Sequence, residues 1–140
     1  MNFTQLMSLA SGHAEARILQ TAVSLGIFDE LQNAPQAAED IATKLHLDPK
    51  ATELLLNALT ALNVLNKEAH GFSLSDAARQ YLLRHSPHYV GGMILFEDLS
   101  WQSWGKLPEA ILTGKPVRAA NMYQEDPKET VIFIDAMDCL

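Results

Sequence analysis

The side chains that most often perform chemistry are few in this sequence and poorly placed to act together. His85 and His88 are close in sequence, but Pro87 between them puts the pair at a helix start rather than on one helical face. Cys139 is the single cysteine and has no partner at the spacing of a zinc site. We therefore expect no metal site in this chain.

Motifs for catalysis or nucleotide binding are also missing. There is no G-x-S-x-G turn, no G-x-x-x-x-G-K-[ST] loop and no G-x-G-x-x-G loop after a strand. Glu97 and Asp98 are adjacent, so on a helix their carboxylates diverge. Gly91-Gly92 precedes an apolar run, which favours a close crossing of two helices over a phosphate cradle. We expect no catalytic and no cofactor-binding residue here.

Apolar side chains are the more informative candidates. Two groups of them have helical spacing, and such spacing suits either the core of the domain itself or a surface that a second chain completes. Enrichment in Trp and Met favours an interface. The sequence therefore offers seven candidates for a dimer interface or a substrate pocket: Phe3, Leu6, Met7, Met93, Phe96, Trp101 and Trp104.

Helices must position most of these residues. Apolar periodicity predicts a short N-terminal helix over residues 3–10, which Ser11-Gly12 should interrupt. A second helix should follow to Leu25, where Gly26 can adopt the left-handed conformation that ends a helix. The sequence thus predicts an N-terminal arm helix, residues 1–11, ahead of the main domain.

Residues 12–83 are typical of a winged helix. A helix over residues 38–45 precedes a longer apolar one over 49–62, which Asp48 should cap and Asn63 should end. Two short strands, residues 64–68 and 72–74, then form a hairpin. This order of helices and strands predicts a mainly α fold with a two-stranded β-hairpin wing.

Residues 84–140 should form a helical extension. Ser86-Pro87 predicts a helix start, and Gly91-Gly92 and Pro108 predict a break or kink in the helix that follows. After a loop of about a dozen residues, Asp126-Pro127 should begin a last helix. That helix reaches Leu140 without a stop signal, so we expect a truncated polypeptide.

A winged helix suggests DNA binding, but the charges oppose it. In the helix over residues 49–62, the polar side chains that could contact base edges are only Lys50, Glu53 and Asn57. The wing has Lys67 beside Glu68. The whole chain of 140 residues carries 10 Lys+Arg against 17 Asp+Glu, a net charge of −7. Neutralising phosphates needs a clustered positive surface, so no nucleic-acid partner is expected.

Composition limits which other classes of protein this chain can belong to. With 48% hydrophobic residues, the chain can bury a core of its own without disulfides or metal. No apolar run is long enough to span a bilayer, and the N-terminus lacks the basic region of a signal peptide. A single cysteine suits a reducing compartment, so we expect a cytoplasmic protein without a membrane partner.

The residues also resemble a known family. Residues 18–31, with the run LGIFDEL at its end, are similar to the opening of the dimerisation domain of S-adenosylmethionine-dependent small-molecule O-methyltransferases. This branch includes plant, hydroxyindole and bacterial antibiotic enzymes. The similarity extends over about residues 10–138, through Ile41-Ala42, Phe72-Ser73-Leu74-Ser75 and Thr113-Gly114 to Ala136-Met137. One departure is Leu62-Asn63, where the family usually has leucine-glycine.

The resemblance implies a division of labour. In the family, a winged-helix-like domain intertwines two subunits, and a following Rossmann-like domain binds S-adenosylmethionine and holds the catalytic base. We therefore expect a homodimer and a small aromatic or polyketide-like hydroxyl substrate for the parent enzyme. The catalytic domain would be absent from this chain, which alone should be inactive. A winged-helix transcription regulator and a stand-alone interaction module remain alternatives.

Overall fold

The computed structural model describes residues 1–118 and 125–139. The chain divides into two compact units, Met1–Tyr89 (unit 1) and Val90–Leu140 (unit 2). Helices dominate both units, and the described residues contain one sheet, a two-stranded antiparallel hairpin. The mainly α fold class predicted from the sequence is therefore confirmed.

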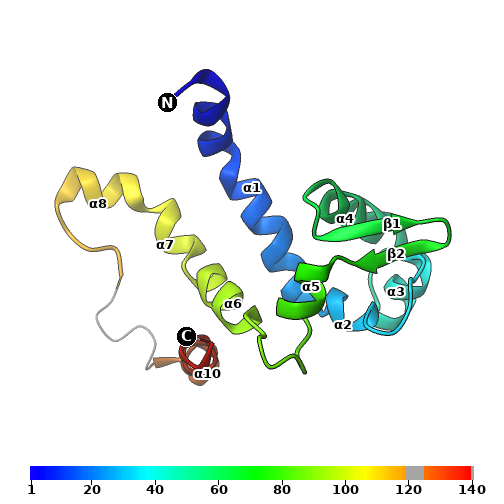
Figure 1. The fold of residues 1–140 in the computed structure, drawn as a ribbon. Helices are drawn as coiled ribbons and strands as arrows, with labels where there is room; N and C mark the ends of the chain where they lie inside the picture. Colours follow the sequence, from blue (N-terminus) through cyan, green and yellow to red (C-terminus); the bar gives the residue numbers. More distant parts are fainter. Residues whose placement is uncertain (119–124, 140) are drawn as a thin grey trace. The chain divides into compact units, whose positions relative to one another are not determined.

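Unit 1 has the winged-helix order of elements (Figure 1). In chain order these are α1 (Phe3–Leu25), α2 (Ile27–Glu30), α3 (Ala38–Leu45), α4 (Pro49–Ala61), β1 (Leu65–Glu68), β2 (Gly71–Leu74) and α5 (Asp76–Tyr81). Helices α3 and α4 pack on each other, and β1 and β2 form the wing, with Leu65 opposite Leu74. The predicted helices over residues 38–45 and 49–62 and the predicted hairpin are thus confirmed.

Helix α1 differs from its prediction, because it runs without a break through Ser11 and Gly12 for 23 residues. A glycine inside a helix costs only about 1 kcal/mol relative to alanine, which the rest of a long helix can offset. A capping box between Asn2 and Gln5 fixes the first turn, and the Ser11 hydroxyl donates to the Met7 carbonyl. The expected interruption at Ser11-Gly12 is therefore wrong.

Three predicted helix boundaries in unit 1 are confirmed. Gly26 ends α1 with φ of 74°, and Asn63 adopts φ of 59° just after α4. The Asp48 carboxylate accepts a hydrogen bond of 2.7 Å from the Ala51 amide at the start of α4. These caps satisfy backbone groups that a helix end leaves without partners. Asp48 and Asn63 thus fix where α4 begins and ends.

Every helix of unit 1 and the wing contribute buried hydrophobic side chains to its core. Its largest fully buried members are Phe28, Ile27, Leu31, Ile41, Leu56, Leu59 and Leu65. Burying one such side chain contributes roughly 1.5–3 kcal/mol. Unit 1 therefore has a hydrophobic core made of its own residues.

The second edge of β2 is also paired. Gln36 and Phe72 exchange two backbone hydrogen bonds, of 3.0 Å and 2.8 Å, in an antiparallel bridge. Gly71 lies against this segment with φ of 141°, and a Cβ there would fall 2.1 Å from the Gln36 carbonyl oxygen. Only glycine fits such an approach. The bridge ties the wing to the segment that leads into α3.

Unit 2 contains α6 (Gly91–Leu99), α7 (Trp101–Gly105), α8 (Leu107–Thr113) and α10 (Pro127–Asp138). The predicted break is confirmed, and it falls at Ser100 and again at Lys106, just before Pro108. The predicted helix start at Ser86-Pro87 is wrong, because Ser86 forms a local turn in which its hydroxyl accepts from the His88 amide. Residues 119–124 of the predicted loop before Asp126 lie outside the described residues.

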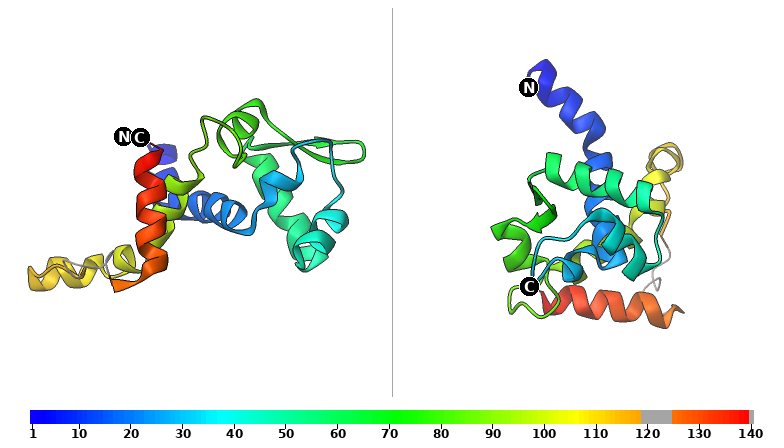
Figure 2. Two further views of the ribbon diagram at one scale, coloured as in Figure 1. Left: turned by 90° about the horizontal axis from the view of Figure 1, so that it is seen from below. Right: turned by 90° about the vertical axis from the view of Figure 1, so that its right-hand side faces the viewer.

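A close crossing of α6 and α10 holds unit 2 together (Figure 2). Gly92 lies at the crossing, where a Cβ would fall 2.7 Å from the Asp135 carbonyl oxygen. The rings of Phe96 and Phe133 pack at 5.8 Å between centroids, tilted by 58°. The predicted close helix crossing is confirmed at Gly92.

Candidate functional site

The N-terminal half of α1 lies open to solvent. Every residue from Met1 to Arg17 is exposed except Gly12, which is half-buried. Phe3 is 77% exposed, Leu6 51% and Met7 49%. These three predicted candidates therefore lie on one projecting helix rather than in the core of their own unit.

The composition of α1 explains why this exposure matters. Glu15 and Arg17 are its only acidic and basic residues, with His13 beside them, in a helix of 23 residues. Solvent-exposed helices usually carry many more charges, and removing apolar surface from water stabilises by roughly 25 cal/mol per Å². A long, ordered, charge-poor helix of this kind is typical of a surface that another protein covers.

Helix α4 has two apolar sides, and only one of them is fully buried in the core. Thr52, Leu56 and Leu59 face the core and are buried. A second set, spaced i, i+3, i+4, i+7 and i+10, forms what we call the outer stripe, made of Ala51, Leu54, Leu55, Ala58 and Ala61. Leu54 is 65% exposed. Sequence reasoning saw one apolar helix here and did not separate these two sides.

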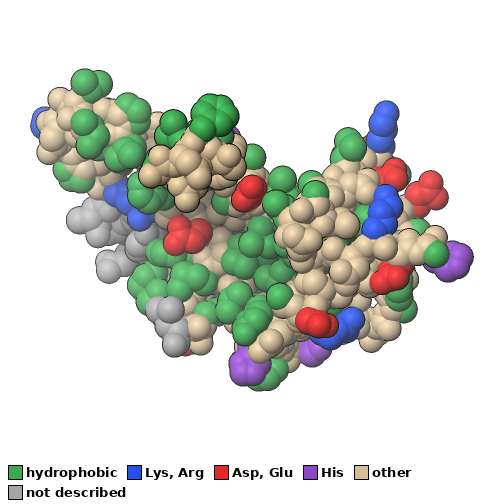
Figure 3. Space-filling model, turned by 45° about the horizontal axis from the view of Figure 1, so that its top comes forward, with side chains coloured by type: hydrophobic (Ala, Val, Ile, Leu, Met, Phe, Trp, Pro, Cys, Tyr) green, Lys and Arg blue, Asp and Glu red, His purple; other side chains and the backbone are tan. Residues whose placement is uncertain are grey.

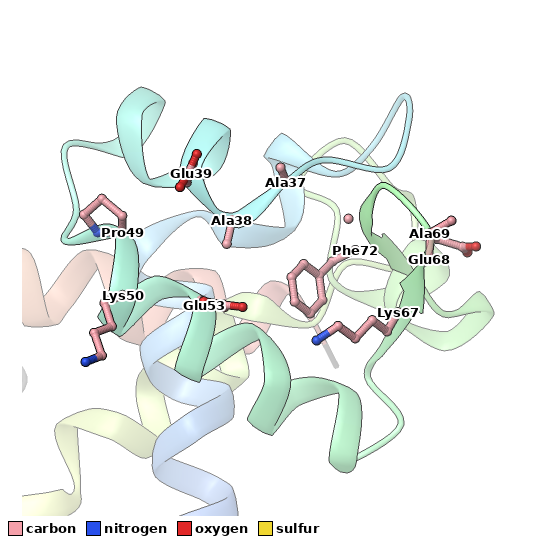
Figure 4. A pocket seen from close by; sticks show the side chains of 11 residues that line it. Ala37, Ala38, Glu39, Pro49, Lys50, Glu53, Lys67, Glu68, Ala69 and Phe72 are labelled. Carbon is pink, nitrogen blue, oxygen red and sulfur yellow. The ribbon is translucent and has the colours of Figure 1, made fainter.

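A groove of about 450 Å³ lies between the start of α3, the start of α4 and the wing (Figure 4). The Lys67 ammonium lies 5.3 Å from the centre of the Phe72 ring and donates to Asn57 at 2.7 Å. The rim carries the lysines Lys50 and Lys67 and the acidic residues Glu39, Glu53 and Glu68. A rim of mixed sign does not offer the positive surface that a phosphate backbone needs.

Unit 2 has a groove of about 480 Å³ along α6, α7 and α8. Its lining is mostly apolar, and it includes the predicted candidates Phe96 and Trp104 together with Leu107. Polar groups lie at one side, where the Arg118 guanidinium donates to the Ser100 hydroxyl. An apolar groove with a few polar groups is the usual form of a small-molecule site.

The four candidates of unit 2 divide between two environments. Phe96 and Met93 are half-buried on α6, where Phe96 packs on Phe133. Trp104 is 64% exposed and Trp101 39%. The structure thus brings Phe96 and Trp104 together at the groove and leaves Met93 and Trp101 outside its lining.

Sequence reasoning missed three residues on α8. Leu107, Ile111 and Leu112 are exposed, and Leu112 is 85% exposed. In Figure 3 the lobe at upper left, which carries α8, shows several hydrophobic side chains (green) on its surface. The spacing of Leu107 and Ile111, four residues apart, could have revealed an apolar side on this helix.

S-adenosylmethionine does not fit the described part of the chain. A Rossmann-like site places a glycine-rich turn between a parallel strand and a helix. The only sheet among the described residues is the β1–β2 hairpin, which is antiparallel. Neither groove is lined by such a turn. The same residues contain no cluster of three or more His, Cys, Asp or Glu side chains that could hold a metal ion. Nor do they form a helix both long and apolar enough to cross a membrane.

Comparison with known proteins gives these surfaces a family context. Residues 7–84, more than half of the chain, match the family model described as the O-methyltransferase dimerisation domain. Acetylserotonin O-methyltransferase of Rattus norvegicus is 32% identical over 130 residues, which are 90% of this chain and 30% of that protein. The tetracenomycin polyketide synthesis 8-O-methyl transferase of Streptomyces glaucescens is 30% identical over 141 residues, covering 96% of this chain and 42% of that protein.

A solved structure shows the same fold. The crystal structure of human N-acetylserotonin methyltransferase in complex with SAM superposes with a TM-score of 0.89 at 24% identity. The match covers 98% of this chain and 45% of that one. This chain therefore spans less than half the length of each of these three proteins.

Proposed function

This chain belongs to the O-methyltransferase dimerisation domain family, and on that premise we propose that it joins two subunits of an S-adenosylmethionine-dependent O-methyltransferase. The observation that carries the proposal is that the first half of α1 is solvent-exposed and poor in charges, with Phe3, Leu6 and Met7 exposed. Most of that helix lies within the matched residues 7–84. The chain forms a homodimer through this helix.

The substrate of the whole enzyme is a small aromatic or polyketide-like molecule with a hydroxyl group. The names of the two relatives support this, since one methylates acetylserotonin and the other acts in tetracenomycin polyketide synthesis. The groove of unit 2 supports it physically, because Phe96 and Trp104 offer aromatic surface to a flat ligand. Residues 90–118 of this chain contribute one wall of the substrate pocket.

The cofactor and the catalytic base belong to a further domain. Relatives more than twice as long as this chain support that division, as does the poor fit of S-adenosylmethionine to the described residues. The 140 residues alone are therefore inactive. The single cysteine and the lack of a membrane-spanning helix among the described residues support a cytoplasmic location.

The test is to express this chain together with the coding sequence that follows codon 140. Purified protein is incubated with tritiated S-adenosylmethionine and a panel of hydroxylated indoles, naphthoates and polyketide aromatics. We expect label on an acceptor oxygen for the longer protein and none for the 140-residue chain. Salt-sensitive binding to duplex DNA without any methyl transfer would instead support a transcription regulator.

A further inference from the structure

The outer stripe of α4 is a second apolar surface of unit 1 that is largely open to solvent. Leu55 and Ala58 in its middle are half-buried. Ala51, Leu54 and Ala61 are exposed, although the other side of the same helix is buried in the core. None of the five stripe residues carries a charge or a side-chain hydrogen-bonding group. Such a surface offers nothing to a phosphate or a polar ligand, and it suits another apolar helix side.

The position of α1 indicates that α1 of a second copy is the helix that covers the outer stripe. Its C-terminal half is anchored in unit 1, where Ala22 and Val23 are buried, and α1 packs against α4. Its N-terminal half projects away from α4 (Figure 1). The first 17 residues are exposed almost without exception and extend over roughly 25 Å at the rise of an α-helix. No described part of unit 1 covers this half.

A two-fold symmetric dimer can bring the exposed first half of α1 in one copy against the outer stripe of α4 in the other. In a symmetric dimer the contact of one patch with another occurs twice, once in each direction. If two copies of α1 pair antiparallel, the N-terminal half of one lies beside the C-terminal half of the other. That C-terminal half is the part anchored next to α4.

We propose that the outer stripe of α4 receives the first half of the partner subunit's α1. In this contact Leu54 and its neighbours pack against the partner subunit's Phe3, the partner subunit's Leu6 and the partner subunit's Met7. This inference rests on the proposed function, because it requires a homodimer. Both surfaces lie within one unit, so the contact needs no particular arrangement of units 1 and 2.

The proposal also explains why the exposed side of α4 lacks the polar side chains of a DNA-recognition helix. In DNA-binding winged helices the corresponding helix presents polar side chains to base edges. Here its open side is apolar, and the polar residues Lys50, Glu53 and Asn57 face the wing groove or the wing itself. The helix that would enter a major groove receives a protein helix instead.

Two neighbouring positions on α4 allow a matched test. Leu54 belongs to the outer stripe, whereas Glu53 is exposed on the groove side. Leu54→Lys is expected to raise the dimer dissociation constant at least tenfold in sedimentation equilibrium, and Glu53→Lys to change it less than twofold. Circular dichroism and the unfolding midpoint of the monomer should stay the same for both variants. Equal effects of the two lysines on dissociation would overturn the proposal.

Cross-linking gives a second, independent readout. In a Cys139→Ser background, Leu6→Cys combined with Leu54→Cys should form an interchain disulfide on mild oxidation, seen as a covalent dimer on a non-reducing gel. Leu6→Cys combined with Glu53→Cys should give at least tenfold less. A dimer in solution that cross-links no better through Leu54→Cys would refute the α1–α4 contact and leave the homodimer intact. A parent chain that is strictly monomeric would refute the proposed function itself.

Discussion

The two units of this chain differ in how they bury hydrophobic side chains. Among the described residues, every buried hydrophobic side chain except Ala136 belongs to unit 1. Unit 2 relies on the α6–α10 crossing and exposes Trp104, Ile111 and Leu112. Unit 1 therefore has the core of an independently folding domain, whereas much of the apolar surface of unit 2 stays exposed.

The same contrast occurs within single helices of unit 1. Helix α1 is buried at Ala22 and Val23 but open over its first half, and α4 is buried at Leu56 but open at Leu54. A helix that is apolar on both sides suits a dimer, because one side serves the fold and the other serves the partner. Substitutions on the two sides of one helix test this separation.

The largest expected effect compares two leucines of α4. Leu56→Ala removes a fully buried side chain and should lower the free energy of unfolding by about 2–5 kcal/mol. Leu54→Ala, at a position 65% exposed, should change it by less than about 0.5 kcal/mol. Urea denaturation at a protein concentration low enough to keep the chain monomeric measures both. Similar losses for the two variants would mean that α4 has no separate outer side.

A second prediction concerns the crossing in unit 2. Gly92→Ala places a Cβ 2.7 Å from the Asp135 carbonyl oxygen and should cost about 1–3 kcal/mol through overpacking. Gly105→Ala meets open space and serves as the control. Hydrogen exchange should accelerate in α6 and α10 of the Gly92→Ala variant and stay unchanged in α2–α4. Faster exchange throughout unit 1 would show that the two units unfold together.

Two equivalent caps give a smaller effect. Asp48→Ala and Asp126→Ala each remove a carboxylate that accepts a backbone amide, and each should cost about 1 kcal/mol. The loss at Asp48 should lower the unfolding midpoint of unit 1. The loss at Asp126 should appear only as faster hydrogen exchange in α10. An effect of Asp126→Ala on the midpoint of unit 1 would contradict separate units.

The smallest effect on stability is expected on α8. Leu112→Ser changes a side chain that is 85% exposed, so the free energy of unfolding should shift by less than about 0.5 kcal/mol. The fluorescence of a hydrophobic dye bound to the chain should fall, because apolar surface is lost. A destabilisation above about 1 kcal/mol would mean that Leu112 supports the fold of unit 2.

Local chemistry made much of the fold predictable. Asp48, Asn63 and Gly26 mark helix ends because their side chains, or the lack of one, suit a specific backbone geometry. Two expectations failed for the opposite reason. Gly12 did not break α1, since helix length outweighed one glycine, and Ser86-Pro87 formed a turn instead of a helix start.

The candidate surfaces were only partly readable from the sequence. Phe3, Leu6 and Met7 stood out because they precede the winged-helix order of elements. Leu54 did not, because apolar residues at helical spacing look the same whether they face the core or a partner. Only the packing of α4 on α3 and the wing decides that Leu56 is inside and Leu54 outside.

The central claim is that this chain pairs with a second copy of itself. Sedimentation equilibrium of the 140-residue chain across the micromolar range tests it most directly. The claim predicts a species of twice the 15.4 kDa chain mass, converted to monomer by Leu54→Lys but not by Glu53→Lys. A single species of 15.4 kDa at every concentration would contradict it.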